Sequence, residues 1–190
     1  IPIVLGGPHV TAVPADTLQA CSAFDYGVIG EGEETITALV NALDEGDLIP
    51  DDIPGVVSRK DRTLSLPPPR NPIKNLDDLP FPAWDLLDDF PRGYRPAIFK
   101  YKKSPSTHIV SARGCPGRCV FCDTSVFGRH VRFHSPEYVL EMVATLQKRF
   151  GIRDIIFEDD QFLLKAERVV KICEGLLKAQ APISWSCSGR

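Results

Sequence analysis

Three cysteines in one short stretch are the side chains best suited to chemistry in this chain. Cys115, Cys119 and Cys122 follow the spacing Cys-x3-Cys-x2-Cys. Thiolates from one loop can each ligate one iron of a cubane iron–sulfur cluster, which leaves a fourth iron open to a substrate or cofactor. The spacing therefore predicts a cluster that takes part in chemistry rather than one that only carries electrons.

Two other interpretations of these cysteines remain open. Zinc also binds thiolates, and His130 and His134 are near in sequence. Zinc usually takes four protein ligands, often in two pairs, so the spacing favours the cluster. Incidental core thiols are the second alternative, and that is the expectation for Cys21, Cys173 and Cys187. The side chains of His108, His130 and His134 are expected to be at the surface or satisfied by polar neighbours.

The elements that must position the cysteine loop alternate between strand and helix. Strands are expected at 107–111, 154–158 and 183–187, with helices at 135–151 and 166–178. Ser135 is a good N-cap ahead of Pro136, and Gly151 suits the helix end. The inward faces are expected to hold Val139, Leu140, Val143 and Leu146 in the first helix, and Val169, Val170, Cys173, Leu176 and Leu177 in the second. This order predicts three strands of a parallel barrel, with the cysteine loop at the carboxyl edge, where α/β barrels place active sites.

Residues 1–50 show a similar alternation. Short strands are expected at 1–5 and 26–29, and helices at 14–20 and from Glu33 to Gly46. The second helix should bury one face, made of Ile36, Leu39, Val40 and Leu43. Strands that alternate with helices pair in parallel, so this segment is predicted to be part of a doubly wound α/β sheet.

Residues 51–105 separate these two regions. A hairpin is expected at 54–66, across a polar turn near Lys60 and Asp61. Nine of the 17 prolines lie in 67–105, which disfavours long regular elements. The connector is too apolar for a free linker, so it should pack on the domains through Phe81, Trp84, Leu86 and Leu87.

Composition excludes several classes of protein. The 190 residues are 43% hydrophobic and 25% charged, with a net charge of −3, which is ordinary for a globular cytoplasmic protein and offers no nucleic-acid surface. No apolar run approaches the roughly 18–20 residues that span a bilayer. Met142 is the only methionine and both ends lie in apolar runs, so the sequence is expected to be a fragment that does not turn over substrate alone.

The Cys-x3-Cys-x-aromatic-Cys loop after a first strand resembles the radical S-adenosylmethionine (SAM) superfamily. The resemblance implies that Cys115, Cys119 and Cys122 hold a 4Fe–4S cluster and that SAM chelates the fourth iron. It implies cleavage of SAM to a 5′-deoxyadenosyl radical by an electron from a donor such as flavodoxin or ferredoxin. Phe121 is then expected near the adenine, and no side chain is assigned as catalytic.

The ends of the second and third strands extend this resemblance. Glu158-Asp159-Asp160 replaces the family's Gly-Gly-Glu and looks like the Phe-x-Asp-Asp-x-Phe variant of cobalamin-linked members. Asp160 aligns with the glutamate that contacts the SAM amino group, with Asp159 as the second choice. A solvated acidic loop is the alternative. Ser186 and Arg190 are expected to meet the SAM ribose or carboxylate.

Two glycine loops resemble the later half of a cobalamin-binding domain. Gly6 and Gly7 would let the corrin's nucleotide tail approach the backbone, and the loop of Gly30, Glu31 and Gly32 would lie beside them. The segment 80–85 resembles the interdomain connector of the same class, whereas the Asp-x-His-x-x-Gly segment is absent. A pair of turn glycines in any α/β domain is the alternative.

The expected fold class is therefore α/β. The C-terminal part of a Rossmann-like cobalamin-binding domain (1–50) is followed by a hairpin and connector (51–105), then the first half of a radical SAM partial TIM barrel (106–190). The resemblance, which includes the anaerobic magnesium-protoporphyrin ester cyclase-like group, implies methylation, rearrangement or cyclisation of an unactivated carbon in a small molecule. The alternatives are a methylthiotransferase-like enzyme without cobalamin and a non-catalytic module stabilised by zinc.

Overall fold

The computed structural model describes residues 1–46, 52–60, 63–65, 68–179 and 182–189. The chain forms two compact units. The first comprises Ile1–Ile73 with Gly117–Arg129, and the second comprises Lys74–Pro116 with His130–Arg190. Among the described residues, no helix has the length and apolar character needed to cross a membrane.

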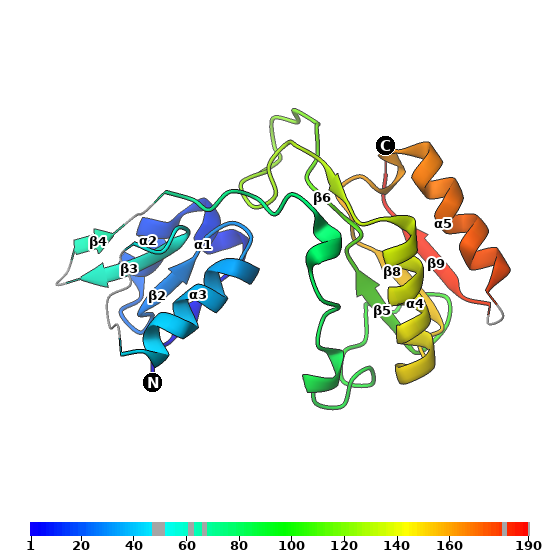
Figure 1. Ribbon diagram of the computed structural model, residues 1–190, viewed down its shortest axis with the longest axis horizontal. Coiled ribbons are helices and arrows are strands. Elements are labelled where there is room, and N and C mark those ends of the chain that lie inside the picture. Colours follow the sequence, from blue (N-terminus) through cyan, green and yellow to red (C-terminus); the bar gives the residue numbers. More distant parts are fainter. Residues whose placement is uncertain (47–51, 61–62, 66–67, 180–181, 190) are drawn as a thin grey trace. The chain divides into compact units, whose positions relative to one another are not determined.

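The first unit is built on a four-stranded sheet in the order β1-β2-β3-β4 (Figure 1). Its strands are β1 (Val4–Leu5), β2 (Tyr26–Val28), β3 (Val56–Lys60) and β4 (Thr63–Ser65). β1 and β2 are parallel, whereas β3 is antiparallel to both β2 and β4. The predicted hairpin is thus confirmed, and it extends the same sheet. The tip of its turn, 61–62, is outside the described residues.

Helices cover both faces of this sheet. They are α1 (Pro8–Ala12), α2 (Pro14–Ala20) and α3 (Glu33–Asp44). Tyr26 and Val28 pack with Leu39 of α3, whereas Gly27 faces the other helices, where an added Cβ would lie 3.0 Å from Val10 and 3.5 Å from Leu18. The alternation of side chains along β2 confirms the doubly wound prediction.

The predicted inward face of α3 is partly wrong. Leu39 is fully buried and Leu43 packs against the same cluster, but Ile36 and Val40 are 37% and 53% exposed. Thr35, which is fully buried, takes the place expected for an apolar residue. Its hydroxyl donates to the Pro54 carbonyl oxygen at 3.2 Å and accepts from Arg70 Nε at 3.0 Å, so the burial of a polar group is offset by hydrogen bonds.

The second unit contains a parallel sheet in the order β5-β8-β9, with two long helices packed on it (Figure 1). The elements are β5 (Ser106–Ile109), α4 (Pro136–Phe150), β8 (Asp154–Phe157), η3 (Phe162–Leu164), α5 (Ala166–Lys178) and β9 (Ser184–Cys187). This order confirms the predicted β-α-β-α-β succession. Consecutive strands are neighbours, as in a barrel wall.

The ends of α4 are where the sequence placed them. Ser135 Oγ accepts a hydrogen bond from Tyr138 N at 3.1 Å, and Pro136 is the first helical residue. Gly151 ends the helix with φ +65°, the left-handed conformation that glycine adopts without strain. The core between α4 and the sheet contains Val139, Val143 and Leu146.

The predicted inward face of α5 needs correction. Val170 and Leu177 are 54% and 84% exposed, so they face outward. The buried positions are Arg168 and Ile172, which are four residues apart and therefore lie on one side of the helix. A charged residue in this buried row was not expected from the sequence.

The proline-rich connector packs on the second unit. It contains two short 3-10 helices, η1 (Leu76–Asp78) and η2 (Trp84–Leu86). Trp84 is 7% exposed within the core, and Phe81 meets Tyr138 edge-on with ring centroids 4.8 Å apart. The same prediction is wrong for Leu86 and Leu87, which are 80% and 40% exposed.

Candidate functional site

The cysteine loop is closed at its base by a small two-stranded sheet. β6 (Ala112–Arg113) pairs antiparallel with β7 (Arg132–Phe133), so residues 114–131 form a loop between paired strands. Next to this pair, Ser111 O accepts a hydrogen bond from His134 N at 3.0 Å. No sequence pattern indicated this closure, because each strand has only two residues.

Asp159 ties the base of the loop to the end of β8. One oxygen of its carboxylate accepts from Ser111 N at 2.5 Å and Ala112 N at 3.0 Å, and the other accepts from Ser111 Oγ at 2.6 Å. Asp159 is 3% exposed and Ser111 is fully buried. The two carboxylate oxygens of Asp159 thus satisfy three donors at the point where the chain enters the cysteine loop.

Arg168 of α5 holds the same base from the other side. Its Nε donates to His134 O at 2.9 Å, and its Nη2 donates to Ser111 O at 2.8 Å. The guanidinium carbon lies 5.2 Å from the Phe133 ring centroid and 5.9 Å from that of Phe162, at cation–π distances. Nη1 has no hydrogen-bond partner among the described residues.

Asp159 and Arg168 compensate one another electrostatically. Burial raises the pKa of Asp159, while hydrogen bonds from Ser111 and Ala112 and the positive charge of Arg168 oppose the rise. Burial lowers the pKa of Arg168, and the negative charge of Asp159 opposes that change. Hydrogen bonds chiefly offset the burial of the Asp159 charge, and the opposite charges of the two residues add to this.

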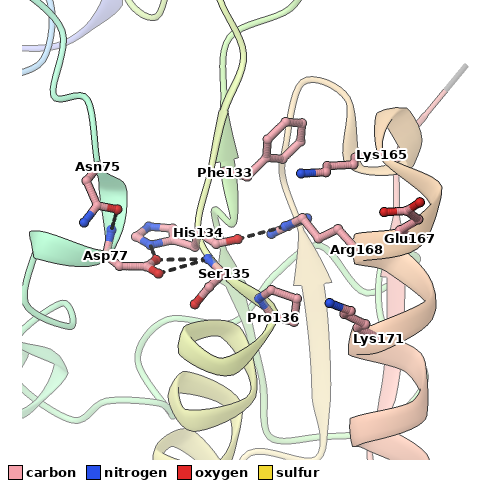
Figure 2. Close-up of a pocket in the computed structure, with 10 residues that line it drawn as sticks. All are labelled: Asn75, Asp77, Phe133, His134, Ser135, Pro136, Lys165, Glu167, Arg168 and Lys171. Carbon is pink, nitrogen blue, oxygen red and sulfur yellow. Dashed lines mark hydrogen bonds and ion pairs between the residues drawn. The ribbon is translucent and has the colours of Figure 1, made fainter.

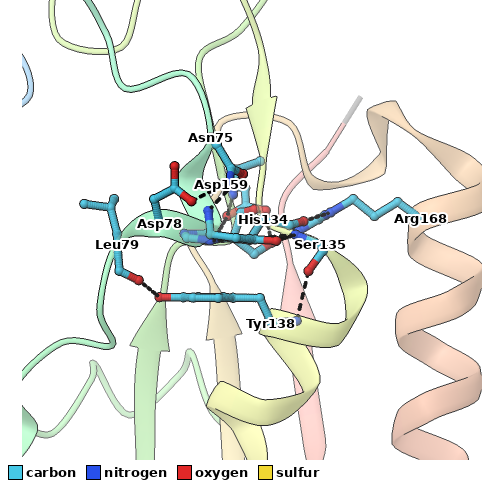
Figure 3. Close-up of polar contacts among 11 residues, drawn as sticks. Asn75, Asp78, Leu79, His134, Ser135, Tyr138, Asp159 and Arg168 are labelled. Atoms are coloured by element: carbon cyan, nitrogen blue, oxygen red, sulfur yellow. Dashed lines mark hydrogen bonds and ion pairs between the residues drawn. The ribbon is translucent and has the colours of Figure 1, made fainter.

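A second polar cluster supports the chain directly after β7. Asp77 accepts from Ser135 N at 3.0 Å and pairs with His134 Nδ1 at 3.1 Å (Figure 2). The His134 ring stacks on Tyr138 with centroids 4.1 Å apart, and Tyr138 donates its hydroxyl proton to Leu79 O at 2.9 Å (Figure 3). Burial lowers the pKa of His134. The expectation of a satisfied polar histidine is confirmed here.

A pocket of about 370 Å³ lies between this cluster and α5 (Figure 2). Lys165, the N-cap of α5, and Arg168 and Lys171 of α5 line it opposite Phe133, His134 and Ser135. Asp77 and Glu167 also line the pocket, so its charge is mixed. None of the residues predicted to bind a cofactor lines this pocket.

The tip of the loop contains the remaining residues of the cysteine motif. Cys115 and Cys119 are half-buried thiols and Cys122 is an exposed one. Val120 and Phe121 are 102% and 83% exposed. In the part of the chain that the structure describes, no three His, Cys, Asp or Glu side chains are gathered around a common metal position. The donor set nevertheless fits the predicted cluster, because one loop carries three cysteine thiols that are not in disulfide bonds.

Local hydrogen bonds shape this tip. Cys122 N donates to Cys119 O at 3.1 Å. Asp123 accepts from Ser125 N at 2.9 Å and from Ser125 Oγ at 2.8 Å, which forms a turn directly after the last cysteine. These bonds from Ser125 lower the pKa of Asp123. Arg129 Nη1 also donates to Gly117 O.

The acidic residues after β8 have different environments. Glu158 is paired with Lys100 at 3.1 Å and with His108 Nδ1 at 2.8 Å, and the bond from Lys100 is the main cause of its lowered pKa. Asp159 is buried, whereas Asp160 is exposed. Ser186 is an exposed residue of β9, in register with Ile156. The predicted role of Arg190 concerns a residue outside those described.

The two predicted cobalamin loops lie side by side at the carboxyl ends of β1 and β2. Gly30 N donates to Thr11 Oγ1 at 3.1 Å, and Thr11 Oγ1 donates to Gly7 O at 2.8 Å. Gly7 and Gly30 have φ +104° and +75°, and nothing lies within 4 Å of a Cβ added to either. Glu31 accepts from Ile73 N at 3.3 Å. Thr11, which the sequence did not single out, joins the loops, and the open backbone fits a large ligand at close approach.

Two family models match separate parts of the chain. Residues 109–190 match the radical SAM superfamily, and residues 1–40 match the B12 binding domain. The first match contains the whole cysteine motif, and the second contains both glycine loops.

Curated relatives match almost the entire chain. An uncharacterized methyltransferase from Pyrococcus horikoshii is 38% identical over 99% of this chain, which spans 39% of that protein. The anaerobic magnesium-protoporphyrin IX monomethyl ester cyclase of Rubrivivax gelatinosus is 29% identical over 98% of the chain, and 33% of its own length is covered. The chain thus spans less than half of these relatives.

A solved structure shares the fold. The cobalamin-dependent SAM radical enzyme OxsB, with aqua-cobalamin and SAM bound, matches 96% of this chain and 25% of its own, with a TM-score of 0.76 and 22% identity. Sequence motifs and family models agree on one order: a segment that matches the B12 binding domain precedes a segment that matches the radical SAM superfamily.

Proposed function

We propose that the full-length protein is a cobalamin-dependent radical SAM enzyme that acts on an unactivated carbon of a small molecule. One observation supports this most. A loop with three cysteines at the predicted spacing, closed by β6 and β7, follows directly after the first strand of the parallel sheet. Active sites of parallel α/β barrels lie at this edge.

The proposed 4Fe–4S cluster would be held by Cys115, Cys119 and Cys122. When bound, it would supply the single electron needed for reductive cleavage of SAM, delivered by a donor such as flavodoxin or ferredoxin. Three thiolate ligands leave one iron open to the amino and carboxylate groups of SAM. The exposed ring of Phe121 offers an apolar face for the adenine.

The other SAM contacts would come from the ends of the next strands. Asp160 is exposed directly after β8 and could pair with the cationic SAM amino group through a charge-assisted hydrogen bond. Ser186 and Arg190 are proposed to meet the SAM ribose or carboxylate. Asp159, the second choice from the sequence, has both oxygens bonded to the cysteine-loop base.

Cobalamin would bind at the glycine loops of the first unit. Gly6, Gly7, Gly30 and Gly32 present backbone without side chains, and Thr11 holds the two loops together. Close approach of a corrin tail requires this absence of side chains. Glu31 would serve chiefly to fix its loop, through its bond to Ile73 N.

The reaction class is proposed as methylation, rearrangement or cyclisation. Relatives named as methyltransferases and as a cyclase support this range without selecting within it. SAM with an isotopically labelled methyl group would distinguish methylation from the other two reactions. Label in the product indicates methylation, and unlabelled product with 5′-deoxyadenosine indicates rearrangement or cyclisation.

The test is anaerobic purification and reconstitution of the full-length protein, with analysis of iron, sulfide, zinc and cobalamin. The proposal predicts a brown protein that binds cobalamin and converts SAM to methionine and 5′-deoxyadenosine when reduced. A colourless protein with stoichiometric zinc would establish the zinc module instead. A cluster without any cobalamin affinity would favour a methylthiotransferase-like enzyme.

A further inference from the structure

Two buried carboxylates occupy opposite ends of β8. Asp154, its first residue, is 1% exposed, and Asp159, two residues beyond its last, is 3% exposed. Asp154 accepts hydrogen bonds from Lys102 N at 3.1 Å and from Ser184 Oγ. Asp154 and Asp159 are thus similarly buried and similarly bonded, but they contact different segments of the chain. Only Asp159 contacts the base of the cysteine loop.

Ser111 is the residue through which Asp159 reaches the loop. Its amide and hydroxyl both donate to Asp159, and its carbonyl oxygen accepts from His134 N and Arg168 Nη2. All of its polar groups are therefore used, four residues before Cys115. The path of the backbone into the cysteine loop is determined by these bonds, because Ser111 is fully buried and has no room for another arrangement.

We propose that Asp159 is a positioning residue for the cluster loop, with Arg168 as its partner, and that it does not bind SAM. The inference rests on the proposed function and divides the paired acids between two tasks. Asp159 orients the chain that leads into Cys115. Asp160, its exposed neighbour, is left for the SAM amino group.

The geometry argues against a ligand on Asp159. Three donors already use its two oxygens, and 3% exposure leaves no approach for an ammonium group. An alanine at this position would leave the buried amides of Ser111 and Ala112 without acceptors. An asparagine keeps an oxygen for those two amides, and its amino group can face Ser111 Oγ, because a hydroxyl also accepts.

The experiment compares Asp159→Ala, Asp159→Asn and Asp160→Asn with Asp154→Ala as the matched control, all in the full-length protein. We would measure the rate of cluster reconstitution, the electron paramagnetic resonance spectrum of the reduced cluster, the SAM dissociation constant of loaded protein, and the melting temperature. We expect Asp159→Ala to slow cluster uptake at least about tenfold, which corresponds to the cost of one buried amide left without an acceptor. Asp159→Asn should restore most of the wild-type rate of uptake. Asp154→Ala should lower the melting temperature comparably and leave uptake unchanged.

The SAM titration separates the two acids. Loaded Asp159→Asn should bind SAM within about twofold of wild type, whereas Asp160→Asn should load normally and lose about tenfold or more in affinity. Normal loading with weakened SAM binding in Asp159→Asn would overturn the inference, as would equal slowing of uptake by Asp154→Ala. Wild-type protein that takes up no iron and sulfide would instead overturn the proposed function, and this inference with it.

Discussion

The base and the tip of the cysteine loop differ in what holds them. At the base, Ser111 is fully buried and bonded to Asp159, Arg168 and His134. At the tip, Val120 and Phe121 are exposed, and among the described residues no three His, Cys, Asp or Glu side chains gather at one position. The protein's own packing thus defines the entry to the loop, whereas the proposed cluster would define its end through metal–thiolate bonds, as expected where metal binding is coupled to folding.

Removal of a cysteine at the tip should have the largest effect. Cys115→Ala, Cys119→Ala and Cys122→Ala should each abolish a cluster that wild type holds at about four irons per chain, because each removes one iron ligand. The measurement is iron and sulfide content after anaerobic reconstitution. Cys173→Ala is the control and should load fully, so equal loss in all four variants would show that the ligands are wrongly assigned.

Removal of a charge at the base should instead cost stability. Arg168→Met is expected to destabilise the apo protein by about 3 kcal/mol, because it removes the charged donor of the Ser111 and His134 carbonyl oxygens and a positive charge near buried Asp159. Urea unfolding of the full-length protein measures this. Lys171→Met, an exposed lysine on the same helix, is the control and should change stability by less than about 0.5 kcal/mol. Equal losses of stability in the two variants would show that Arg168 at the loop base contributes no more than a surface lysine.

A change at the exposed Asp160 should weaken the binding of SAM and leave uptake of the cluster unchanged. Asp160→Asn should weaken SAM binding by roughly 1.5–3 kcal/mol through loss of a charge-assisted hydrogen bond. Titration of SAM against the reduced cluster, followed by its spectral change, gives the dissociation constant. Asp85→Asn, an exposed acid of the connector, should have no effect. An unchanged constant in Asp160→Asn would refute its role.

The smallest effect is expected at Glu158, whose environment contrasts with that of its buried neighbour. The bond from Lys100 and the pairing with His108 hold the pKa of Glu158 below the ordinary 4.5. Its stabilising contribution is therefore present above pH 4.5 and is lost as the pH falls through the lowered pKa.

Because Glu158 is 39% exposed, solvent screening limits this contribution to less than about 1 kcal/mol. Glu158→Gln should be slightly less stable than wild type at pH 7, and the difference should disappear in acid. Urea midpoints at the two pH values provide the test. A stability difference between variant and wild type that grows as the pH falls would contradict a lowered pKa of Glu158.

Local sequence signals predicted the second unit well. Ser135, Pro136 and Gly151 act through their own backbone neighbours, so the limits of α4 could be read from the sequence. The loop cysteines were recognisable because their spacing is local. In contrast, Asp159, Arg168 and Thr11 matter through partners 19 to 57 residues away, which no short pattern reveals. Val170 and Leu177 were misplaced because the buried row of α5 contains Arg168 with Ile172, and a buried arginine is invisible to a pattern of apolar residues.

Hydrogen exchange of the full-length protein, apo and cluster-loaded, tests the contrast between base and tip most directly. Anaerobic measurement by mass spectrometry can follow peptides that cover 106–116 and 130–136 at the base and 117–129 at the tip. The bonds of Ser111, Ala112 and His134 predict that base amides exchange slowly in both states. Tip amides should slow at least about tenfold only after loading, because metal ligation folds the segment that carries the thiolates. Equal slowing of base and tip on loading, or a tip already protected in the apo protein, would contradict the account.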